Sequence, residues 1–428
     1  PISNFTSMQV TVDGTNNVGF LRNSDTATIN TNAITLDAAK LGTTFNFGTT
    51  ATGGALIRSD INEVKLSKSI TVPKTGTKNS LMQAGKTGTV TLVSGNTITS
   101  TASAEFYGMT AGSFTGTADG KKAIAKNNGE LNIGGNKSLG MAIDVDDEGI
   151  NNGKINFSGT SGAGVYNTGT FTSNSGSEIN ISGQSSVGAF NSGTNGNLTI
   201  ANGAKIQGTA DNTTGIYGTD GTATNNGTIT MTADSVKGLV AGGANANVIN
   251  NKTVTVTGKG AVGAASLEGT ITAAAGSITA DGTSGIALYT GGTVGGTINA
   301  TGGDIDAKNG AINVYSDKGT INFNGATINT GANSLAFIQS SNGGIVDFKS
   351  ATTANIATDG TGFYIPPAST PTTVTYTPFT GIGSISGFNN LSNLTLNMFK
   401  NSNVAVASYA ESDLSALTGS SITGLNIV

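Results

Sequence analysis

The chain has 428 residues, of which 64 are glycine, and it contains no cysteine, histidine or tryptophan. Only 11% of its residues are charged, and the formal net charge is −4. Catalytic sites that need histidine or cysteine, metal sites built from those side chains and disulfide frameworks are therefore excluded. The acidic balance argues against a nucleic-acid surface, because phosphate binding needs concentrated positive charge.

Residues 1–120 contain short apolar phrases at uneven spacing. Examples are residues 18–21, 55–57, 80–82 and 106–107. They resemble a phrase that recurs regularly further along the chain, so we expect irregular β-solenoid coils with longer loops in this region.

Between residues 121 and 365 one phrase recurs about every 24–25 residues. It opens with a small residue that apolar residues follow. Its successive copies begin at Gly140, Gly164, Gly188, Gly215, Gly238, Gly263, Gly285, Gly310, Ser334 and Gly362. Two further segments, such as 153–157 and 177–181, fall inside each period. In them apolar residues alternate with Thr or Asn, which is typical of a strand with one buried face.

Three short strands per period and no helical spacing predict an all-β fold, a parallel β-helix (β-solenoid) with loop insertions. Stacked coils pair every strand with a neighbour and bury one continuous internal column. The residues expected to point inward include Ile155, Phe157, Ile229, Met231, Val254, Val256, Ile321 and Phe323. An antiparallel sandwich or barrel also uses short alternating strands, but it does not explain why the phrases recur in one order.

Residues 366–380 interrupt this pattern. They hold four of the six prolines, at Pro366, Pro367, Pro371 and Pro378. Proline cannot donate a hydrogen bond to a strand ladder, so we expect a loop insertion here. Alternation resumes at 394–398 and 404–406, which predicts further coils over 381–428.

Four aromatic residues flank this loop: Phe363, Tyr364, Tyr376 and Phe379. A proline-stiffened loop that carries aromatic rings is a candidate recognition surface. The alternative, which we favour, is that the rings fold back and cap the local core.

An acidic patch consists of Asp144, Asp146, Asp147 and Glu148. Its spacing copies the opening of a calcium loop, but the closing glutamate is absent because that position is Ile155. We therefore interpret the patch as a solvated acidic loop at a coil corner, with weak calcium binding or capture of a cationic partner as the alternatives. No metal and no cofactor are predicted.

Tyr166, Phe190 and Tyr217 each lie two residues after the opening glycine of a coil. Their column is expected to continue at Val240, Ala265 and Ala287. Outward rings would form a ladder usable for carbohydrate, whereas inward rings would fill the core; we favour the inward arrangement. Asn167 and Asn191 are expected to form a hydrogen-bonded ladder beside them.

The phrases at 162–167 (GAGVYN) and 225–230 (NNGTIT) resemble the passenger repeats of large type V autotransporter adhesins. The similarity is greatest to the fusobacterial outer-membrane adhesins and covers about residues 120–365. It implies a right-handed β-helix, exported through the outer membrane of a Gram-negative bacterium by a C-terminal translocator barrel. It also implies a cell-surface location and loops that bind protein or glycan receptors on host cells or other bacteria.

We therefore expect a monomeric adhesin segment that attaches noncovalently, without enzymatic activity or nucleic-acid binding. The translocator barrel is not part of this sequence, which we interpret as an internal or N-terminal portion of a longer passenger. The alternatives are a purely structural spacer or stalk, and a rod that associates with itself.

Overall fold

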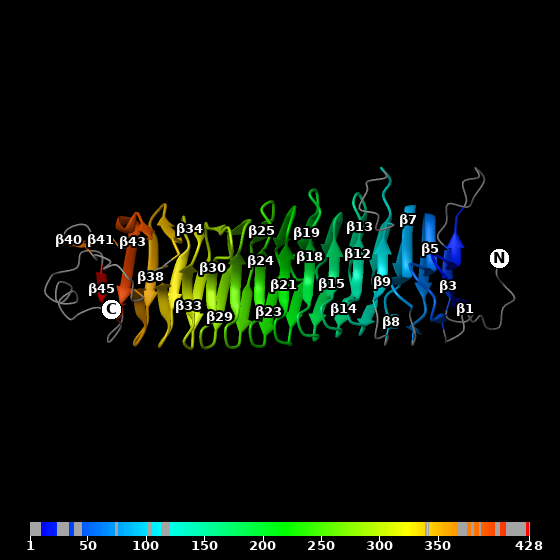
Figure 1. Cartoon of the computed structure of the whole chain (residues 1–428), viewed down its shortest axis with the longest axis horizontal. Coiled ribbons are helices and arrows are strands. Elements are labelled where there is room, and N and C mark those ends of the chain that lie inside the picture. The colour runs from blue at the N-terminus through cyan, green and yellow to red at the C-terminus, as the bar shows by residue number, and fades with distance from the viewer. Residues whose placement is uncertain are drawn as a thin grey trace. The chain divides into compact units, whose positions relative to one another are not determined.

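The computed structural model describes residues 10–23, 34–37, 45–72, 76–100, 105–112, 120–338, 340, 342–365, 375–377, 381–384, 387–398, 403–407 and 425–427. The chain divides into two compact units, Pro1–Thr228 and Ile229–Val428. Each unit is a parallel β-solenoid with three strand-bearing faces, and its strands stack side by side in Figure 1. No helix in the described ranges is both long and apolar enough to cross a bilayer.

In the first unit the strands of three faces follow one another along each coil. The first face contains β2 (Val18–Arg22), the opening parts of β5 (Ala55–Ser67) and β7 (Asn79–Leu92), β9 (Phe106–Ala111), β12 (Leu139–Ile143), β15 (Ala163–Asn167), β18 (Val187–Asn191) and β21 (Thr214–Gly218). The second contains β3 (Ile34–Asp37), the closing parts of β5 and β7, β10 (Ile124–Asn127), β13 (Glu148–Asn151), β16 (Thr170–Ser173), β19 (Asn197–Ile200) and β22 (Thr222–Asn225). The third contains β6 (Ile70–Val72), β8 (Thr97–Ser100), β11 (Glu130–Ile133), β14 (Lys154–Phe157), β17 (Glu178–Ile181) and β20 (Lys205–Gly208). A separate parallel pair joins β1 (Val10–Val12) to β4 (Phe45–Phe47).

The second unit repeats this arrangement. Its first face contains β24 (Lys237–Ala241), β27 (Val262–Ser266), β30 (Ile286–Thr290), β33 (Ile312–Ser316), β36 (Leu335–Ile338), β39 (Thr361–Ile365) and β44 (Asn403–Ala407). The second contains β25 (Asn247–Asn250), β28 (Thr270–Ala273), β31 (Gly296–Ala300), β34 (Gly319–Phe323), β37 (Ile345–Phe348) and β42 (Phe388–Asn389). The third contains β23 (Thr228–Thr232), β26 (Val254–Thr257), β29 (Ser277–Asp281), β32 (Asp304–Lys308), β35 (Thr327–Thr330), β38 (Thr352–Ile356), β43 (Leu394–Met398) and β45 (Leu425–Ile427). The short 3₁₀ helix η1 (Leu391–Asn393) and the antiparallel pair β40 (Thr375–Thr377) and β41 (Gly381–Ser384) complete it.

The internal column confirms the parallel β-helix expected from the repeat. On the third face Ile155 pairs in register with Ile179, which pairs with Ile206, and all three side chains are fully buried. Every inward residue named from the sequence is likewise buried. Burying a side chain of this size stabilises a fold by roughly 1.5–3 kcal/mol relative to exposure, and each coil adds several.

The opening glycines of the coils are required by packing. A β-carbon at Gly164 would lie 2.7 Å from the carbonyl oxygen of Gly188 and 2.7 Å from Cγ2 of Ile179. Both distances are shorter than a β-carbon tolerates, so a side chain here would push the first face away from the third.

One corner of each regular coil holds a residue in the left-handed region. Ser161 and Ser185 each have a φ of 56°, Ser235 has 57° and Ser284 has 58°. The corners differ in length from coil to coil, so the strands themselves need not change. Ala163 pairs with Val187, and Val187 pairs with Thr214 across a longer coil, yet the register of the strands is kept.

Candidate functional site

The aromatic column of the first unit consists of Tyr166, Phe190 and Tyr217, on the first face. Successive ring centroids are 5.4 and 5.5 Å apart, with interplanar angles of 13° and 17°. All three rings are half-buried and face outward, whereas Val165 and Asn167 on either side of Tyr166 are fully buried. The inward arrangement favoured from the sequence is therefore wrong. The asparagine occupies the interior, and the period-two alternation of a strand then places the ring outside.

The predicted asparagine ladder is confirmed beside this column. Nδ2 of Asn167 donates to Oδ1 of Asn191 at 2.7 Å, and Nδ2 of Asn191 donates to the carbonyl of Asp220 at 2.7 Å. Oδ1 of Asn167 is the one fully buried side-chain polar atom without a partner in the described part of the chain. The ladder ends here because the residue paired with Asn167 in the preceding coil is Ile143, whose side chain has no hydrogen-bond donor.

The three rings do not form an open platform. Nearly parallel rings at these distances cannot lie in one plane, so they form an offset stack in which each ring partly covers the next. The hydroxyl of Ser192 donates to the phenolic oxygen of Tyr166 at 3.1 Å and fixes the first ring. The column therefore presents ring edges and partial faces to solvent.

In the second unit the corresponding column differs from the sequence prediction. Ala265 pairs with Tyr289, whereas Ala287 is fully buried. The prediction took Gly285 as the opening small residue of that coil, but the register gives this position to Ala287, two residues later. In register, the column of this unit consists of Val240, Ala265, Tyr289, Tyr315, Ile338 and Tyr364. Val240 and Ala265 are buried, and the four later side chains are half-buried.

Two tyrosines of this column contact each other. The ring centroids of Tyr289 and Tyr315 are 5.7 Å apart at an interplanar angle of 58°. The Tyr315 hydroxyl donates to Oδ1 of Asp317 at 3.1 Å, and Nδ2 of Asn342 donates to the same oxygen at 2.7 Å. Burial and the negative charge of Asp317 raise the pKa of Tyr315 to about 12.

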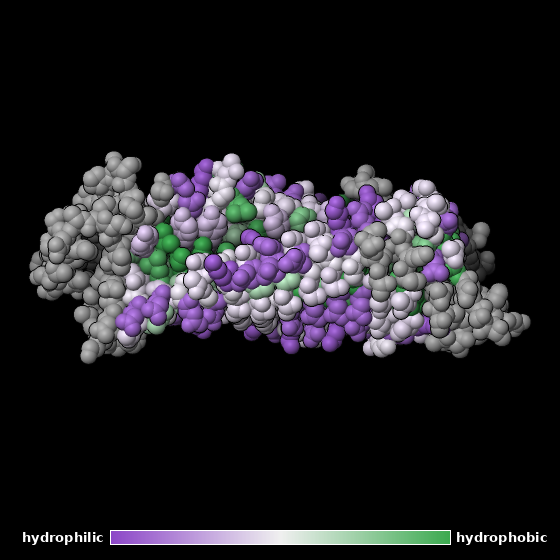
Figure 2. All heavy atoms as spheres, turned by 60° about the horizontal axis from the view of Figure 1, so that its bottom comes forward, coloured by the Kyte–Doolittle hydropathy of each residue, from purple (hydrophilic) through white to green (hydrophobic). Residues whose placement is uncertain are grey.

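A second outward column on the first face makes this surface more apolar. It consists of the half-buried side chains of Val262, Ile286, Ile312 and Leu335. Figure 2 shows a hydrophobic patch in the second unit, in the region where β33 and β38 lie in Figure 1. A contiguous row of half-buried apolar side chains on the surface is a feature of interaction sites.

Of the four aromatic residues predicted to form a binding loop, the structure describes the side chains of Phe363 and Tyr364, and these two point to opposite sides of β39. Phe363 is 1% exposed, stacks on Phe337 at 5.0 Å and meets Phe388 edge-on at 5.2 Å, so it belongs to the core. This contradicts its place in a surface binding loop and agrees with the favoured interpretation that the ring packs on the local core, because the alternation of β39 turns it inward. Tyr364 faces outward in the column described above. Tyr376 lies in β40, and Phe379 and the four prolines lie outside the described residues.

The acidic patch is largely structural. Asp144 and Asp147 are only 5% and 6% exposed. Oδ1 of Asp147 accepts the backbone N–H of Ala123 at 2.7 Å, and Glu148 pairs with Lys122 at 2.8 Å. Asp146 is the exposed member. The interpretation as a solvated loop therefore fails for Asp144 and Asp147. Within the described ranges, no group of three carboxylates is placed to hold a metal ion.

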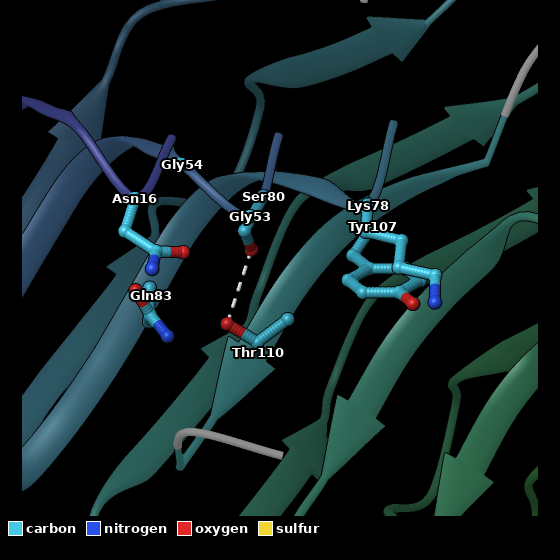
Figure 3. Close-up of a pocket in the computed structure, with 8 residues that line it drawn as sticks. All are labelled: Asn16, Gly53, Gly54, Lys78, Ser80, Gln83, Tyr107 and Thr110. Carbon is cyan, nitrogen blue, oxygen red and sulfur yellow. Dashed lines mark hydrogen bonds between the residues drawn. The ribbon is translucent and has the colours of Figure 1, made fainter. Parts of the chain in front are cut away.

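A polar pocket of about 290 Å³ opens on the first face of the first unit, between β2 and β9. It is lined by Asn16, Gly53, Gly54, Lys78, Ser80, Gln83, Tyr107 and Thr110. Figure 3 shows the amides of Asn16 and Gln83 on one side and Tyr107 and Lys78 on the other, with Ser80 and Thr110 between them. The sequence does not predict this pocket, because its residues come from coils without a regular spacing.

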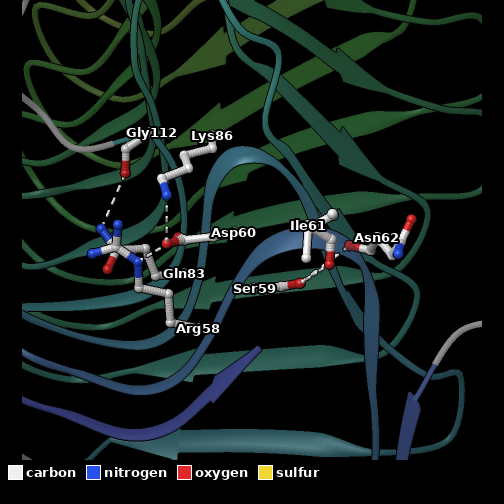
Figure 4. Close-up of polar contacts among 8 residues, drawn as sticks. All are labelled: Arg58, Ser59, Asp60, Ile61, Asn62, Gln83, Lys86 and Gly112. Carbon is white, nitrogen blue, oxygen red and sulfur yellow. Dashed lines mark hydrogen bonds and ion pairs between the residues drawn. The ribbon is translucent and has the colours of Figure 1, made fainter. Parts of the chain in front are cut away.

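Next to the pocket, an ion cluster fixes the bend of β5 (Figure 4). Asp60 is 6% exposed; its Oδ1 accepts from Nε of Arg58 at 2.7 Å, and its Oδ2 lies 3.8 Å from Nζ of Lys86. The Ser59 hydroxyl donates to the carbonyl of Asn62 at 3.1 Å, where the register between β5 and β7 slips. These groups satisfy one another and hold the corner between the first and second faces.

Comparison with known proteins does not extend this description, since no family model, no curated protein and no solved structure matches the chain. The outward rings of Tyr107, Tyr289 and Tyr315 were also missed from the sequence. The signal that finds them is the position one residue before (Tyr107) or two residues after (Tyr289, Tyr315) a coil's opening residue, once the register is known.

Proposed function

We propose that this chain is a segment of a bacterial cell-surface adhesin that attaches noncovalently to host cells or to other bacteria. The observation that supports this most is the outward aromatic and apolar surface on the first face of each unit. A strand face that only meets water would be expected to carry polar side chains, as the outward Thr and Asn of the third face do.

In this proposal the coils hold the binding surface and no reaction is catalysed. The receptor is a protein or glycan on another cell, and the intact protein is a monomer anchored in the outer membrane of a Gram-negative bacterium by a translocator barrel. These assignments rest on the resemblance of the GAGVYN and NNGTIT phrases to autotransporter passengers.

The second candidate is a structural spacer that only provides reach. The regular burial of the core and the ladders between coils favour it, because they serve rigidity without any ligand. A spacer has no need of half-exposed tyrosine rings, and this separates the two proposals.

The test is attachment of beads coated with the purified chain to epithelial cells and to bacterial cells, counted by flow cytometry. The triple variant Tyr166→Ala, Phe190→Ala, Tyr217→Ala is expected to lower attachment by about tenfold, as loss of aromatic hot spots does. Asn156→Ala on the third face is the control and should leave attachment unchanged, and circular dichroism should show an intact β fold for both. Beads coated with the unaltered chain that attach to no cell would contradict the adhesin proposal and support the spacer.

A further inference from the structure

The pocket of the first unit has a buried polar floor. Ser80 and Thr110 are 4% and 1% exposed, and their hydroxyl oxygens are 3.0 Å apart. Gly53 and Gly54 form the adjoining part of the lining and contribute only backbone. The hollow exists because two glycines and two small hydroxyl residues line it.

Neighbouring residues hold this floor in place. Asn79 is fully buried; its Oδ1 accepts the backbone N–H of Gly54 at 2.8 Å, and its Nδ2 donates to the carbonyl of Ala51 at 3.0 Å. A β-carbon at Gly53 would lie 2.5 Å from Oδ1 of Asn16, so the amide of Asn16 rests directly on bare backbone. The pocket is therefore formed before any ligand arrives, which favours affinity.

The walls offer polar groups that other described residues do not use. Nε2 of Gln83 donates to the carbonyl of Gly112 at 3.1 Å. Its Oε1 remains available to accept a hydrogen bond from a ligand. The side chains of Asn16 and Lys78 are exposed and make no hydrogen bond or ion pair with the described part of the chain. Tyr107 adds a half-buried aromatic ring.

This set of groups matches one ligand chemistry. Amides, hydroxyls and an ammonium group bind hydroxyl groups as donors and acceptors, and an aromatic ring packs against an apolar face. A pyranose ring has both, with hydroxyls around its edge and C–H groups on its face. One lysine is too little positive charge for a phosphate-rich ligand, and 290 Å³ is near the lower end of small-molecule sites, roughly 300–1,000 Å³.

We infer that this pocket binds a pyranose unit of a cell-surface glycan, with Tyr107 against the sugar face and Gln83 and Asn16 on its hydroxyls. The inference rests on the proposed adhesin function and names its receptor class. It places the sugar in the pocket and leaves the Tyr166 column, whose rings cover one another, as a separate contact surface for the rest of the receptor.

The experiment measures binding of the whole purified chain to an array of glycans that end in neutral hexoses or in sialic acid. Affinity for the glycans bound is then measured by titration calorimetry. Tyr107→Ala is expected to weaken binding at least about tenfold, and Gln83→Ala several-fold, whereas Tyr107→Phe should stay within about twofold because the ring is kept. Gln207→Ala, which removes a half-buried amide from β20 on the third face of the same unit, is the matched control for Gln83→Ala and should change nothing.

The outcomes separate this inference from the adhesin proposal. Glycan binding that Tyr107→Ala and Gln83→Ala leave unchanged overturns the pocket assignment, as does a chain that attaches to cells but binds no glycan; both leave the adhesin proposal standing. A chain that binds neither cells nor glycans overturns both.

Discussion

At the scale of single residues, buried asparagines decide which way their neighbours face. Asn167 and Asn191 lie inside at the ends of β15 and β18, where their amides bond to corner carbonyls and to each other. The preceding residue of each strand must then point outward, and in both coils it is aromatic. The outward aromatic column is thus a consequence of the polar groups in the corner.

The buried ladder should contribute more to stability than the half-exposed one. Asn191→Ala removes a donor and an acceptor inside the solenoid. The Asp220 carbonyl loses its Asn191 donor, and Asn167 loses one acceptor but keeps its bond to the carbonyl of Gly169. It is expected to lower the free energy of unfolding by about 1–3 kcal/mol. Asn156→Ala on the third face also removes two ladder bonds, to Asn132 and Asn180, but water replaces them, so its effect should be below about 1 kcal/mol.

Urea unfolding of the two variants measures the difference. Equal losses would mean that burial does not set the contribution of a ladder bond.

At the scale of elements, the corners require a conformation that few residues adopt. Ser185 has a φ of 56°, which is unfavourable for a residue with a branched β-carbon. Ser185→Val is expected to lower the free energy of unfolding by roughly 1–2 kcal/mol, whereas Ser185→Gly should leave it equal or higher.

The exposed Ser182, which is not in the left-handed region, is the matched position for this comparison. Ser182→Val should change stability by less than about 0.5 kcal/mol in the same urea experiment. A similar loss at both positions would show that the added side-chain bulk, and not the backbone conformation, is responsible.

The strands and the core could be predicted from the sequence because their pattern is local. Ile155 and Phe157 alternate with polar residues, and alternation alone identifies the buried face. The register could not be predicted as well. Alanine at position 287 replaces the glycine that opens earlier coils, so the pattern points to Gly285 as the opening residue and does not predict Tyr289. The face of Tyr166 was misassigned for a related reason, because Val165 beside it is also apolar and only the hydrogen bonds of Asn167 settle the direction.

At the scale of the whole molecule, the outward tyrosines link stability to alkaline pH. Burial raises the pKa of Tyr107 and Tyr289, and burial together with Asp317 raises that of Tyr315 to about 12 from 10.0. A raised pKa means that the fold favours the neutral phenol. The contribution of these neutral tyrosines to the free energy of unfolding is therefore fully present below about pH 10, and it is lost as the pH rises toward 12.

Unfolding by urea at a series of pH values should show this decline, and phenolate absorbance should show a group that titrates late. Tyr315→Phe keeps the ring and removes the ionisable hydroxyl, so the decline between pH 10 and 12 should become shallower in this variant. An unchanged decline would assign the alkaline sensitivity to other groups.

The corners also define where the molecule tolerates new sequence. Coils of different length keep their strands in register, and the corner between β30 and β31 carries Val294, whose side chain is 64% exposed. A foreign epitope inserted there would project into solvent while the pairing of β30 and β31 with their neighbours stays as it is. The same scaffold could then present a library of peptides at defined, evenly repeated positions.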